Sequence, residues 1–110
     1  YAGSDTVDGV AWYNTNSAST THAVKTKTGN GRGLYDLSGN VWEWVWDWYQ
    51  ANYEALPATD PIGPSTGTRR VLHGGSWGSP TSHARVAARY YYLPTNRSSS
   101  LGFRFVRSYP

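Results

Sequence analysis

The chain has 110 residues and a formal net charge of +3, with 15% charged and 15% aromatic residues, and it contains no cysteine. These values indicate one domain with a single compact core, and the lack of cysteine excludes disulfides, thiolate metal sites and cysteine nucleophiles. There is no Lys/Arg run of the kind found in nucleic-acid grooves and no apolar run long enough to span a bilayer, so we expect no nucleic-acid partner and no membrane insertion. The chain starts at Tyr1 without a Met, and we expect it to be a processed or excised piece of something larger.

The first 32 residues are polar and rich in Ser, Thr, Asn and Gly. Val10–Tyr13 is their only apolar island, and residues 14–21 have the composition of a loop. A polar stretch of this kind buries too little apolar surface to be ordered alone. We therefore expect it to be ordered by packing on another part of the domain or by a bound ion.

Tryptophan occupies every second position in the segment 41–49. In a strand, the four tryptophans from Trp42 to Trp48 would share one face, whereas on a helix they would spread around most of the circumference. The pattern therefore predicts a strand. Because four exposed indoles on one face would be costly in water, we expect that face to belong to the core.

Proline and glycine divide the next part of the chain. Residues 50–68 contain three prolines and two glycines, which predicts a long connection without regular structure. Residues 69–77 predict a second strand, in which Gly74 and Gly75 would let another backbone approach closely.

Two weaker patterns follow toward the C-terminus. Residues 84–89 alternate weakly and fit either a strand or one helical turn. Residues 102–107 alternate clearly and predict the closing strand, with Phe103 and Phe105 on one side of it.

Three segments carry the most specific motifs: GLYDLSGNVWEW at residues 33–44, RVLHGGSW at residues 70–77 and LGFR at residues 101–104. In this order and spacing they resemble the formylglycine-generating enzyme (sulfatase-modifying factor) family, from about Val10 to Ser108. The resemblance implies an α/β (α+β) domain with a C-type lectin-like fold, rich in loops and built on a small twisted antiparallel sheet. Domains of that family are usually much longer, so the chain resembles a trimmed form of their C-terminal portion.

The oxidase chemistry of that family does not carry over with the resemblance. Its enzymes use a cysteine pair shortly after the Gly-Gly-Ser-aromatic motif, and the first of these positions falls on Ser79 here. With no cysteine in the chain, copper-dependent oxidation of a substrate cysteine is excluded. Ser79 and His83 could be combined with an Asp into a hydrolytic triad, but nothing in the spacing separates Ser79 from an ordinary loop serine. We therefore expect a protein that is not an enzyme.

The segment 70–106 carries a second resemblance, to the variable region of diversity-generating retroelement proteins, many of which use this lectin-like scaffold. In such systems errors at template adenines diversify Asn codons, and the genetic code then excludes Trp, Met, Lys, Gln and Glu from the diversified positions. The candidate positions hold none of these types, although an ordinary polar loop also favours Ser, Thr, Gly and Tyr. The candidate ligand-binding positions are Gly78, Ser79, Pro80, Thr81, Ser82, His83, Tyr90, Tyr91, Tyr92, Leu93, Thr95, Asn96, Ser98, Ser99 and Ser100.

Tyr90–Tyr92 lies among small Ser and Thr residues, a composition typical of an antibody-like binding surface. The alternative is that members of the triplet pack inward, and we expect at least one to do so. Trp77 continues the Gly-Gly-Ser strand, so we interpret it as core rather than as a ligand anchor. The arginines between the candidate positions are expected to hold loop carbonyls and acids, because the planar guanidinium fork suits that role; they are Arg85, Arg89, Arg97 and Arg104.

Asn40 and Glu43 match positions near a calcium site in the formylglycine-generating family, and their oxygen donors suit Ca²⁺. The alternative is an Asn that orders a turn and a Glu that pairs with an Arg, and Asp36 is equally ambiguous. The three histidines lie in separate segments and have no metal-ligand spacing. We expect no required cofactor, with Ca²⁺ as the one candidate structural ion.

Together these features predict a single domain over residues 1–110 that binds a ligand through a variable region at about residues 70–106. The expected ligand is a protein or a glycan on a target cell surface. The domain would be displayed on a virus particle or a cell surface if the retroelement interpretation holds. The alternative is a degenerate or partner-dependent domain of the formylglycine-generating enzyme type.

Overall fold

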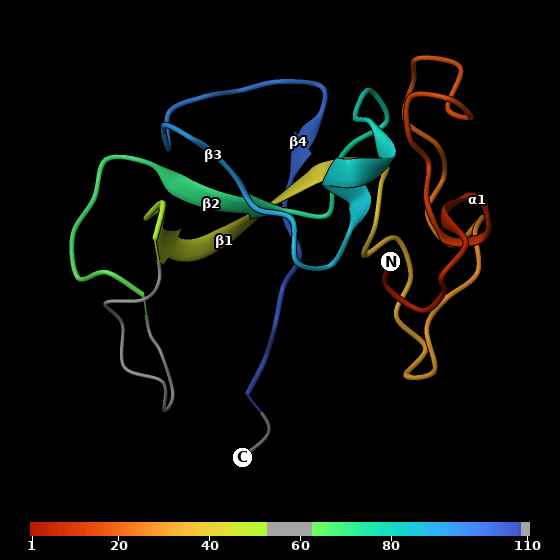
Figure 1. Ribbon diagram of the computed structural model, residues 1–110, viewed down its shortest axis with the longest axis horizontal. Coiled ribbons are helices and arrows are strands. Elements are labelled where there is room, and N and C mark those ends of the chain that lie inside the picture. The colour runs from red at the N-terminus through yellow and green to blue at the C-terminus, as the bar shows by residue number, and fades with distance from the viewer. Residues whose placement is uncertain (53–62, 109–110) are drawn as a thin grey trace.

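The computed structural model describes residues 1–52 and 63–108, and few of these belong to regular elements. In chain order the elements are α1 (Val7–Val10), β1 (Trp42–Trp48), β2 (Arg70–His73), the 3-10 helix η1 (Thr81–Ala84), β3 (Tyr90–Tyr92) and β4 (Leu101–Gly102). The sheet lies on one side of the molecule, and α1 with the loops of the N-terminal third lies on the other (Figure 1). The loop-rich architecture predicted from the sequence is confirmed. Within these two ranges, no helix has the length and apolar character needed to span a bilayer.

The four strands form one sheet in the order β3-β2-β1-β4. β2 is antiparallel to both β1 and β3, whereas β4 is parallel to β1, so the sheet is mixed and the prediction of an antiparallel sheet is wrong for β4. The cause is the connection at residues 93–100, which runs from one edge of the sheet to the other. It returns the chain to the end of the sheet where β1 begins, so β4 runs in the same direction as β1.

The strand predicted from the alternating tryptophans is confirmed as β1, but its tryptophan face is not uniformly buried. Trp42 is 6% exposed, Trp44 and Trp48 are half-buried, and Trp46 is 83% exposed. The expectation that all four belong to the core is therefore wrong for Trp46. The pairing of β1 with β2 becomes irregular between Trp44 and Trp48, and a bulge of this kind carries side chains away from the covered part of a sheet.

The buried core has two parts. The apolar island predicted near the N-terminus forms one of them, a cluster of Val10, Ala11 and Tyr13. Val71 and Leu72 of β2 are fully buried inside the sheet half of the domain. Each part removes apolar surface from water, which is the main favourable contribution to folding.

The polar N-terminal region is tied to the loops around β1 by main-chain and hydroxyl hydrogen bonds. The Asn40 N–H donates to the Trp12 carbonyl at 2.8 Å, and the Ser17 hydroxyl donates to the Trp77 carbonyl at 2.7 Å. These bonds join residues far apart in the sequence. They confirm that this region is ordered by packing on another part of the domain.

Gly74 and Gly75 allow the close backbone approach that the sequence predicted. Both have a positive φ, 96° and 74°, a conformation that L side chains rarely adopt. A Cβ on Gly74 would lie 2.9 Å from the Leu37 carbonyl oxygen, and one on Gly75 would lie 3.1 Å from the His83 backbone. Two loops therefore meet at this pair, directly after β2.

The C-terminal prediction of a closing strand at 102–107 is wrong beyond its first residue. β4 ends at Gly102, and the side chains of Phe103, Phe105 and Val106 are exposed. Beyond this point the side chain of Arg104, and not a strand backbone, contacts β1: it donates to the Glu43 carboxylate and to the Tyr35 carbonyl in the loop before β1. The alternation of residue types in this segment therefore does not reflect pairing within the sheet.

The two remaining predictions concern connections. The ambiguous segment 84–89 is neither a strand nor a helix, and the single 3-10 turn ends at Ala84, where that segment begins. Most of the predicted irregular connection at 50–68 lies outside the described residues. Its described C-terminal part, residues 63–68, contains no regular element, as expected.

Candidate functional site

Three segments that are distant in the sequence meet around Trp42 at the start of β1. The indole of Trp42 has its ring centroid 5.6 Å from that of His83 and 5.5 Å from that of Tyr90. Its backbone N–H donates to the Ser100 carbonyl at 2.7 Å. The buried Trp42 thus contacts all three stretches of candidate positions. These are the stretch that leads into η1, the strand β3, and the connection from β3 to β4.

Trp77 supports the same region from the side. Its backbone N–H donates to the Asn40 carbonyl at 2.7 Å, and its indole Nε1 donates to the Ser99 carbonyl at 3.4 Å. The side chain is half-buried. The interpretation of Trp77 as a core residue that continues the strand is therefore wrong, because β2 ends at His73 and Trp77 lies in the turn beyond it. Its contacts nevertheless place it in the framework beside the candidate positions.

Most of the fifteen candidate positions reach the surface. The exposed ones are Gly78, Pro80, Thr81, Ser82, Tyr90, Tyr92, Leu93, Thr95, Asn96, Ser98 and Ser99, and the half-buried ones are His83, Tyr91 and Ser100. Ser79 is the exception, because it is buried. Its hydroxyl accepts from the Ser76 N–H at 3.0 Å and lies 3.1 Å from the Ser76 hydroxyl, so this side chain holds the turn after Gly75 and does not face a ligand.

The tyrosine triplet divides between the two faces of β3. Tyr91 packs inward on Tyr49, with ring centroids 4.2 Å apart, and the Arg69 guanidinium lies 4.7 Å from the Tyr91 ring. Tyr90 and Tyr92 remain 38% and 37% exposed, in an edge-to-face contact at 5.5 Å. The expectation that at least one tyrosine packs inward is confirmed for Tyr91. The triplet lines a hollow of about 320 Å³ together with Arg69, Leu93 and Asn96.

Two of the four arginines assigned to the scaffold hold carbonyls, as predicted. Arg89 Nη1 donates to the Gln50 carbonyl at 2.9 Å, and Arg104 Nη2 donates to the Tyr35 carbonyl at 2.8 Å. Arg85 and Arg97 are exposed. Arg89 and Arg104 therefore connect the C-terminal half of the chain, which holds the candidate positions, to residues earlier in the sequence.

The residues matched to a calcium site are committed to other partners. Asn40 Oδ1 accepts from the His22 N–H at 3.0 Å, and Asn40 Nδ2 donates to the His22 carbonyl at 3.1 Å. The carboxylate of Glu43 accepts from Arg104 Nη2 at 2.8 Å and from Arg104 Nε at 3.1 and 3.2 Å. This hydrogen bond, together with the charge of Glu43, raises the pKa of the Arg104 guanidinium above its ordinary value.

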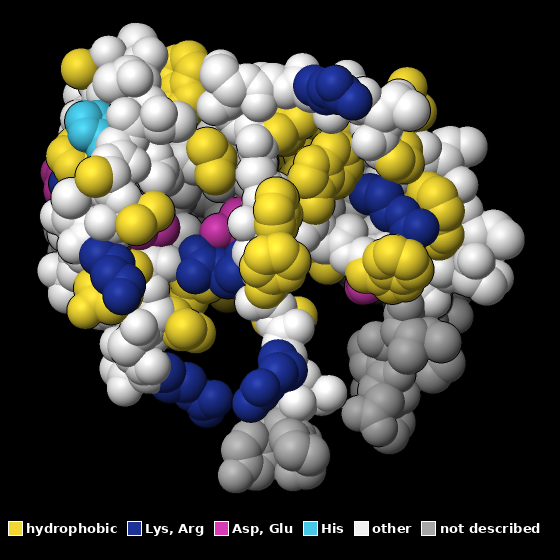
Figure 2. Space-filling model, turned by 180° about the vertical axis from the view of Figure 1, so that it is seen from behind, with side chains coloured by type: hydrophobic (Ala, Val, Ile, Leu, Met, Phe, Trp, Pro, Cys, Tyr) yellow, Lys and Arg dark blue, Asp and Glu magenta, His cyan; other side chains and the backbone are white. Residues whose placement is uncertain are grey.

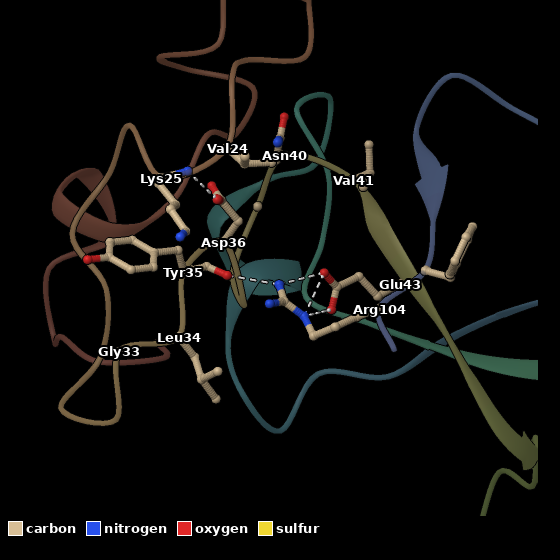
Figure 3. A pocket seen from close by; sticks show the side chains of 12 residues that line it. Val24, Lys25, Gly33, Leu34, Tyr35, Asp36, Asn40, Val41, Glu43 and Arg104 are labelled. Atoms are coloured by element: carbon tan, nitrogen blue, oxygen red, sulfur yellow. Dashed lines mark hydrogen bonds and ion pairs between the residues drawn. The ribbon is translucent and has the colours of Figure 1, made fainter. Parts of the chain in front are cut away.

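Figure 3 shows the Glu43–Arg104 pair at the centre of a cavity of about 370 Å³, with the Asn40 side chain pointing away from it. Asn40 and Glu43 therefore do not converge on one ion, and their geometry matches the alternative of a turn-ordering Asn and an Arg-paired Glu. Within residues 1–52 and 63–108, no three His, Asp or Glu side chains are grouped as metal ligands. In this arrangement Asn40 and Glu43 are both engaged with protein partners, and a structural Ca²⁺ stays a prediction.

Comparison with known proteins identifies the scaffold. Residues 1–109 match the family model described as sulfatase-modifying factor enzyme 1-like domain. The chain belongs to this family. A formylglycine-generating enzyme from Streptomyces coelicolor is 48% identical to it over 88 residues, which cover 76% of this chain and 28% of that enzyme. The chain thus spans less than a third of the length of this relative.

Solved structures of similar proteins support the same scaffold. Treponema denticola variable protein 1 matches with a TM-score of 0.85 and 42% identity, over 94% of this chain and 38% of that one. PvdO from Pseudomonas aeruginosa matches with a TM-score of 0.78 over 94% of this chain and 42% of that one, but at 24% identity it bears on the fold alone. Both resemblances predicted from the sequence, to the sulfatase-modifying factor family and to variable proteins, are confirmed, as is the C-type lectin-like fold.

On this sulfatase-modifying factor scaffold, sequence analysis missed two features. It did not single out Trp42 as the residue on which the variable segments meet, because the four tryptophans of β1 are equivalent in the alternating pattern. It also placed Ser79 among ligand-facing positions. The signal that could have separated Ser79 is its place in a Ser-Trp-Gly-Ser turn, where a hydroxyl can accept from the backbone N–H three residues earlier.

Proposed function

We propose that this chain is a non-catalytic binding module whose ligand surface is diversified by a retroelement. We call this surface the variable surface and define it as the candidate positions that are not turned inward: Gly78, Pro80, Thr81, Ser82, His83, Tyr90, Tyr92, Leu93, Thr95, Asn96, Ser98, Ser99 and Ser100. The observation that carries the proposal is the meeting of these three stretches around Trp42, each composed of residue types that an Asn codon can yield.

The composition of the variable surface suits recognition of many ligands. Tyr90 and Tyr92 offer large, fairly rigid contact areas with a hydroxyl at the tip, and the surrounding Ser, Thr and Asn side chains adapt their hydrogen bonds. The framework beneath these positions is fixed by residue types that the diversification excludes, such as Trp42 and Trp77. The similarity to Treponema denticola variable protein 1 supports the same function.

The chemistry of the chain supports a function without catalysis. No cysteine is present, so the thiol chemistry expected of formylglycine-generating enzymes has no nucleophile here. Ser79, which stands at the first cysteine position of the resemblance, is buried and bonded to Ser76. The module would bind a protein or a glycan on a target cell surface and would be displayed on a virus particle or a cell.

A second candidate function rests on the 48% identity to a formylglycine-generating enzyme. In this case the chain is a degenerate or partner-dependent part of such an enzyme. The genomic neighbourhood separates the two: a reverse transcriptase gene with a near-identical repeat carrying Asn codons at the variable positions supports the first, and a sulfatase gene supports the second.

The proposal is tested by replacing positions in matched libraries. One library changes Thr95, Ser99 and Tyr92 to other residue types that an Asn codon yields, and the control library changes Trp42 and Arg89. Surface changes away from caps and strained turns usually alter stability by less than about 0.5 kcal/mol, so we expect the first library to keep the melting temperature and the control library to lose it. Binders to different cell-surface proteins or glycans should be selectable from the first library. Equal intolerance in both libraries would contradict the proposal.

A further inference from the structure

Trp46 is the most exposed tryptophan of β1, and nothing in the proposed function uses it. Its side chain is 83% exposed, although it belongs to the same alternating pattern as the buried Trp42. A large indole left in water costs free energy that burial would recover, and Trp is enriched among the residues that carry most of the energy of a contact site. Trp46 is therefore a candidate contact residue if a second feature beside it also points to a ligand.

Arg70 packs against the Trp46 side chain and places a positive charge beside it. The Arg70 guanidinium carbon lies 4.6 Å from the Trp46 ring centroid and 3.4 Å from that of Trp48. Arg70 Nη1 also donates to the Trp46 carbonyl. Within residues 1–52 and 63–108, the guanidinium has no carboxylate in ion-pair contact. Among those residues, no acid neutralises the charge that Arg70 places beside Trp46.

Two hollows flank this pair, and Trp46 and Arg70 line both. One has a volume of about 310 Å³ and reaches Pro94, and the other has a volume of about 450 Å³ and reaches Asp47. Both fall within the range of about 300–1,000 Å³ that small-ligand sites occupy. Over the sheet half of the molecule, Figure 2 shows exposed hydrophobic side chains in direct contact with Lys and Arg side chains.

We propose that Trp46 and Arg70 form a fixed subsite for an acidic oligosaccharide. A pyranose ring carries several C–H groups on one face, and these are attracted to the negative face of an indole. A carboxylate on the same sugar would accept two parallel hydrogen bonds from a guanidinium fork. Trp46 thus supplies the stacking platform, and Arg70 selects sugars that carry an acid.

A single-stranded nucleic acid is a poorer match for the same aromatic side chains. Grooves that follow a phosphate backbone combine stacking residues with a row of cations. Among the described residues that line the two hollows, Arg70 is the one cation, and Asp47 adds a negative charge to the larger hollow. The charge pattern favours a ligand with isolated acids along an otherwise neutral, hydroxylated chain.

The subsite borders the variable surface but does not depend on it. Pro94, which lines the smaller hollow, lies between the variable positions Leu93 and Thr95. Trp46 itself lies outside the region 70–106 and is of a type that the diversification cannot produce. It would give every variant of the domain the same contact to a glycan, next to contacts that differ between variants.

The experiment is calorimetric titration of the protein with a short oligogalacturonate, with a maltose oligomer as the neutral probe and an oligothymidylate as the nucleic-acid probe. Trp46→Ala removes the platform, Trp46→Phe keeps an aromatic ring, and Arg70→Gln removes the charge. Phe105→Ala is the matched control, because Phe105 is 88% exposed and lines neither hollow. Thermal melts of each variant establish that it is folded.

We expect saturable binding of oligogalacturonate that Trp46→Ala and Arg70→Gln each weaken by about tenfold or more, as central aromatic and Arg contacts do. Trp46→Phe should retain most of the affinity, and Phe105→Ala should leave it unchanged. Absence of saturable oligogalacturonate binding, or unchanged affinity in Trp46→Ala, overturns the proposal. Tighter binding of oligothymidylate than of oligogalacturonate, lost in Trp46→Ala, would also overturn it and would identify the subsite as one for a nucleic acid. Failure of the variable surface would appear in the Thr95 and Ser99 library instead and would leave these titrations unchanged.

Discussion

Trp42 and Trp46 belong to the same alternating pattern of one short strand, yet one is 6% and the other 83% exposed. The Trp42 end of β1 is covered by His83, Tyr90 and the connection into β4. The Trp46 end carries Arg70 against its ring and two open hollows beside it. The segments packed against a strand, and not its own alternation of residue types, therefore decide which of its side chains are buried.

The largest effect is expected from truncation at the buried end. Trp42→Ala should destabilise the domain by about 3–5 kcal/mol, because a buried aromatic is lost and a cavity remains, whereas Trp46→Ala should cost no more than about 0.5 kcal/mol. Chemical denaturation of both variants measures the difference. Similar losses of stability in the two variants would show that the two ends of β1 do not differ in how much their tryptophans stabilise the domain.

An ion pair next to Trp42 also stabilises the buried end of β1. Arg104→Ala should cost about 1.5–3 kcal/mol, the range for hydrogen bonds to charged groups, because it leaves the half-buried Glu43 carboxylate without its partner. Arg107→Ala in the same C-terminal segment is the control, since Arg107 is exposed. Equal stability of the two variants in a denaturant titration would show that Arg104 does not hold the Trp42 end.

The two faces of β3 provide a smaller contrast. Tyr91→Ala should be more destabilising than Tyr92→Ala by about 0.5–1.5 kcal/mol, since Tyr91 is half-buried and packs on the half-buried ring of Tyr49, whereas Tyr92 is exposed and has an edge-to-face contact with Tyr90. Ligand binding should respond in the opposite order, with Tyr92→Ala losing more affinity. Thermal melts of the two variants test the order of their stabilities, and ligand titrations test the order of their affinities. A reversal of either order would show that the face of β3 assigned to the ligand is wrong.

The smallest effect is expected in the N-terminal region that supports the Trp42 end. Tyr13 donates a hydrogen bond to Asp8 at 2.7 Å, and this bond, followed by burial, raises the pKa of the Tyr13 phenol above the ordinary value of 10.0. A raised folded-state pKa gives stability that is complete below the unfolded value and is lost as the pH rises through the folded value. The parent protein should therefore lose stability at alkaline pH as Tyr13 ionises, and the Tyr13→Phe variant should not show this loss. Parallel melts at increasing alkaline pH measure it, and identical profiles would argue against the Asp8 bond.

Much of the fold could be predicted because the informative motifs are local. Alternating tryptophans predicted β1, and the paired glycines predicted a close approach of two backbones after β2. The order and spacing of three motifs predicted the family scaffold, which the match over residues 1–109 confirms. Features encoded within a few consecutive residues were therefore accessible from the sequence.

The features that escaped prediction depend on contacts between distant segments. The exposure of Trp46 follows from an irregular pairing with β2, and the parallel direction of β4 follows from a connection that crosses the sheet. Phe103 and Phe105 alternate with other residue types as they would in a strand, but strand pairing ends at Gly102. Beyond it, the Arg104 side chain donates to Glu43, which is distant in the sequence. The inward side chain of Ser79 likewise depends on a turn that its residue type does not reveal.

The bonds that fasten the crossing connection have a consequence for how the surface can evolve. Ser100 and Ser99 accept hydrogen bonds from the Trp42 N–H and the Trp77 indole through their main-chain carbonyls, not through their hydroxyls. Every amino acid brings the same carbonyl to its position. A codon change at 99 therefore replaces the side chain offered to a ligand and leaves in place the carbonyl that accepts from Trp77. A change at 100 likewise keeps the carbonyl that accepts from Trp42, and it removes one local contact, between the Ser100 and Ser98 hydroxyls. The bonds that join this loop to the rest of the domain are thus independent of which amino acid the codon specifies.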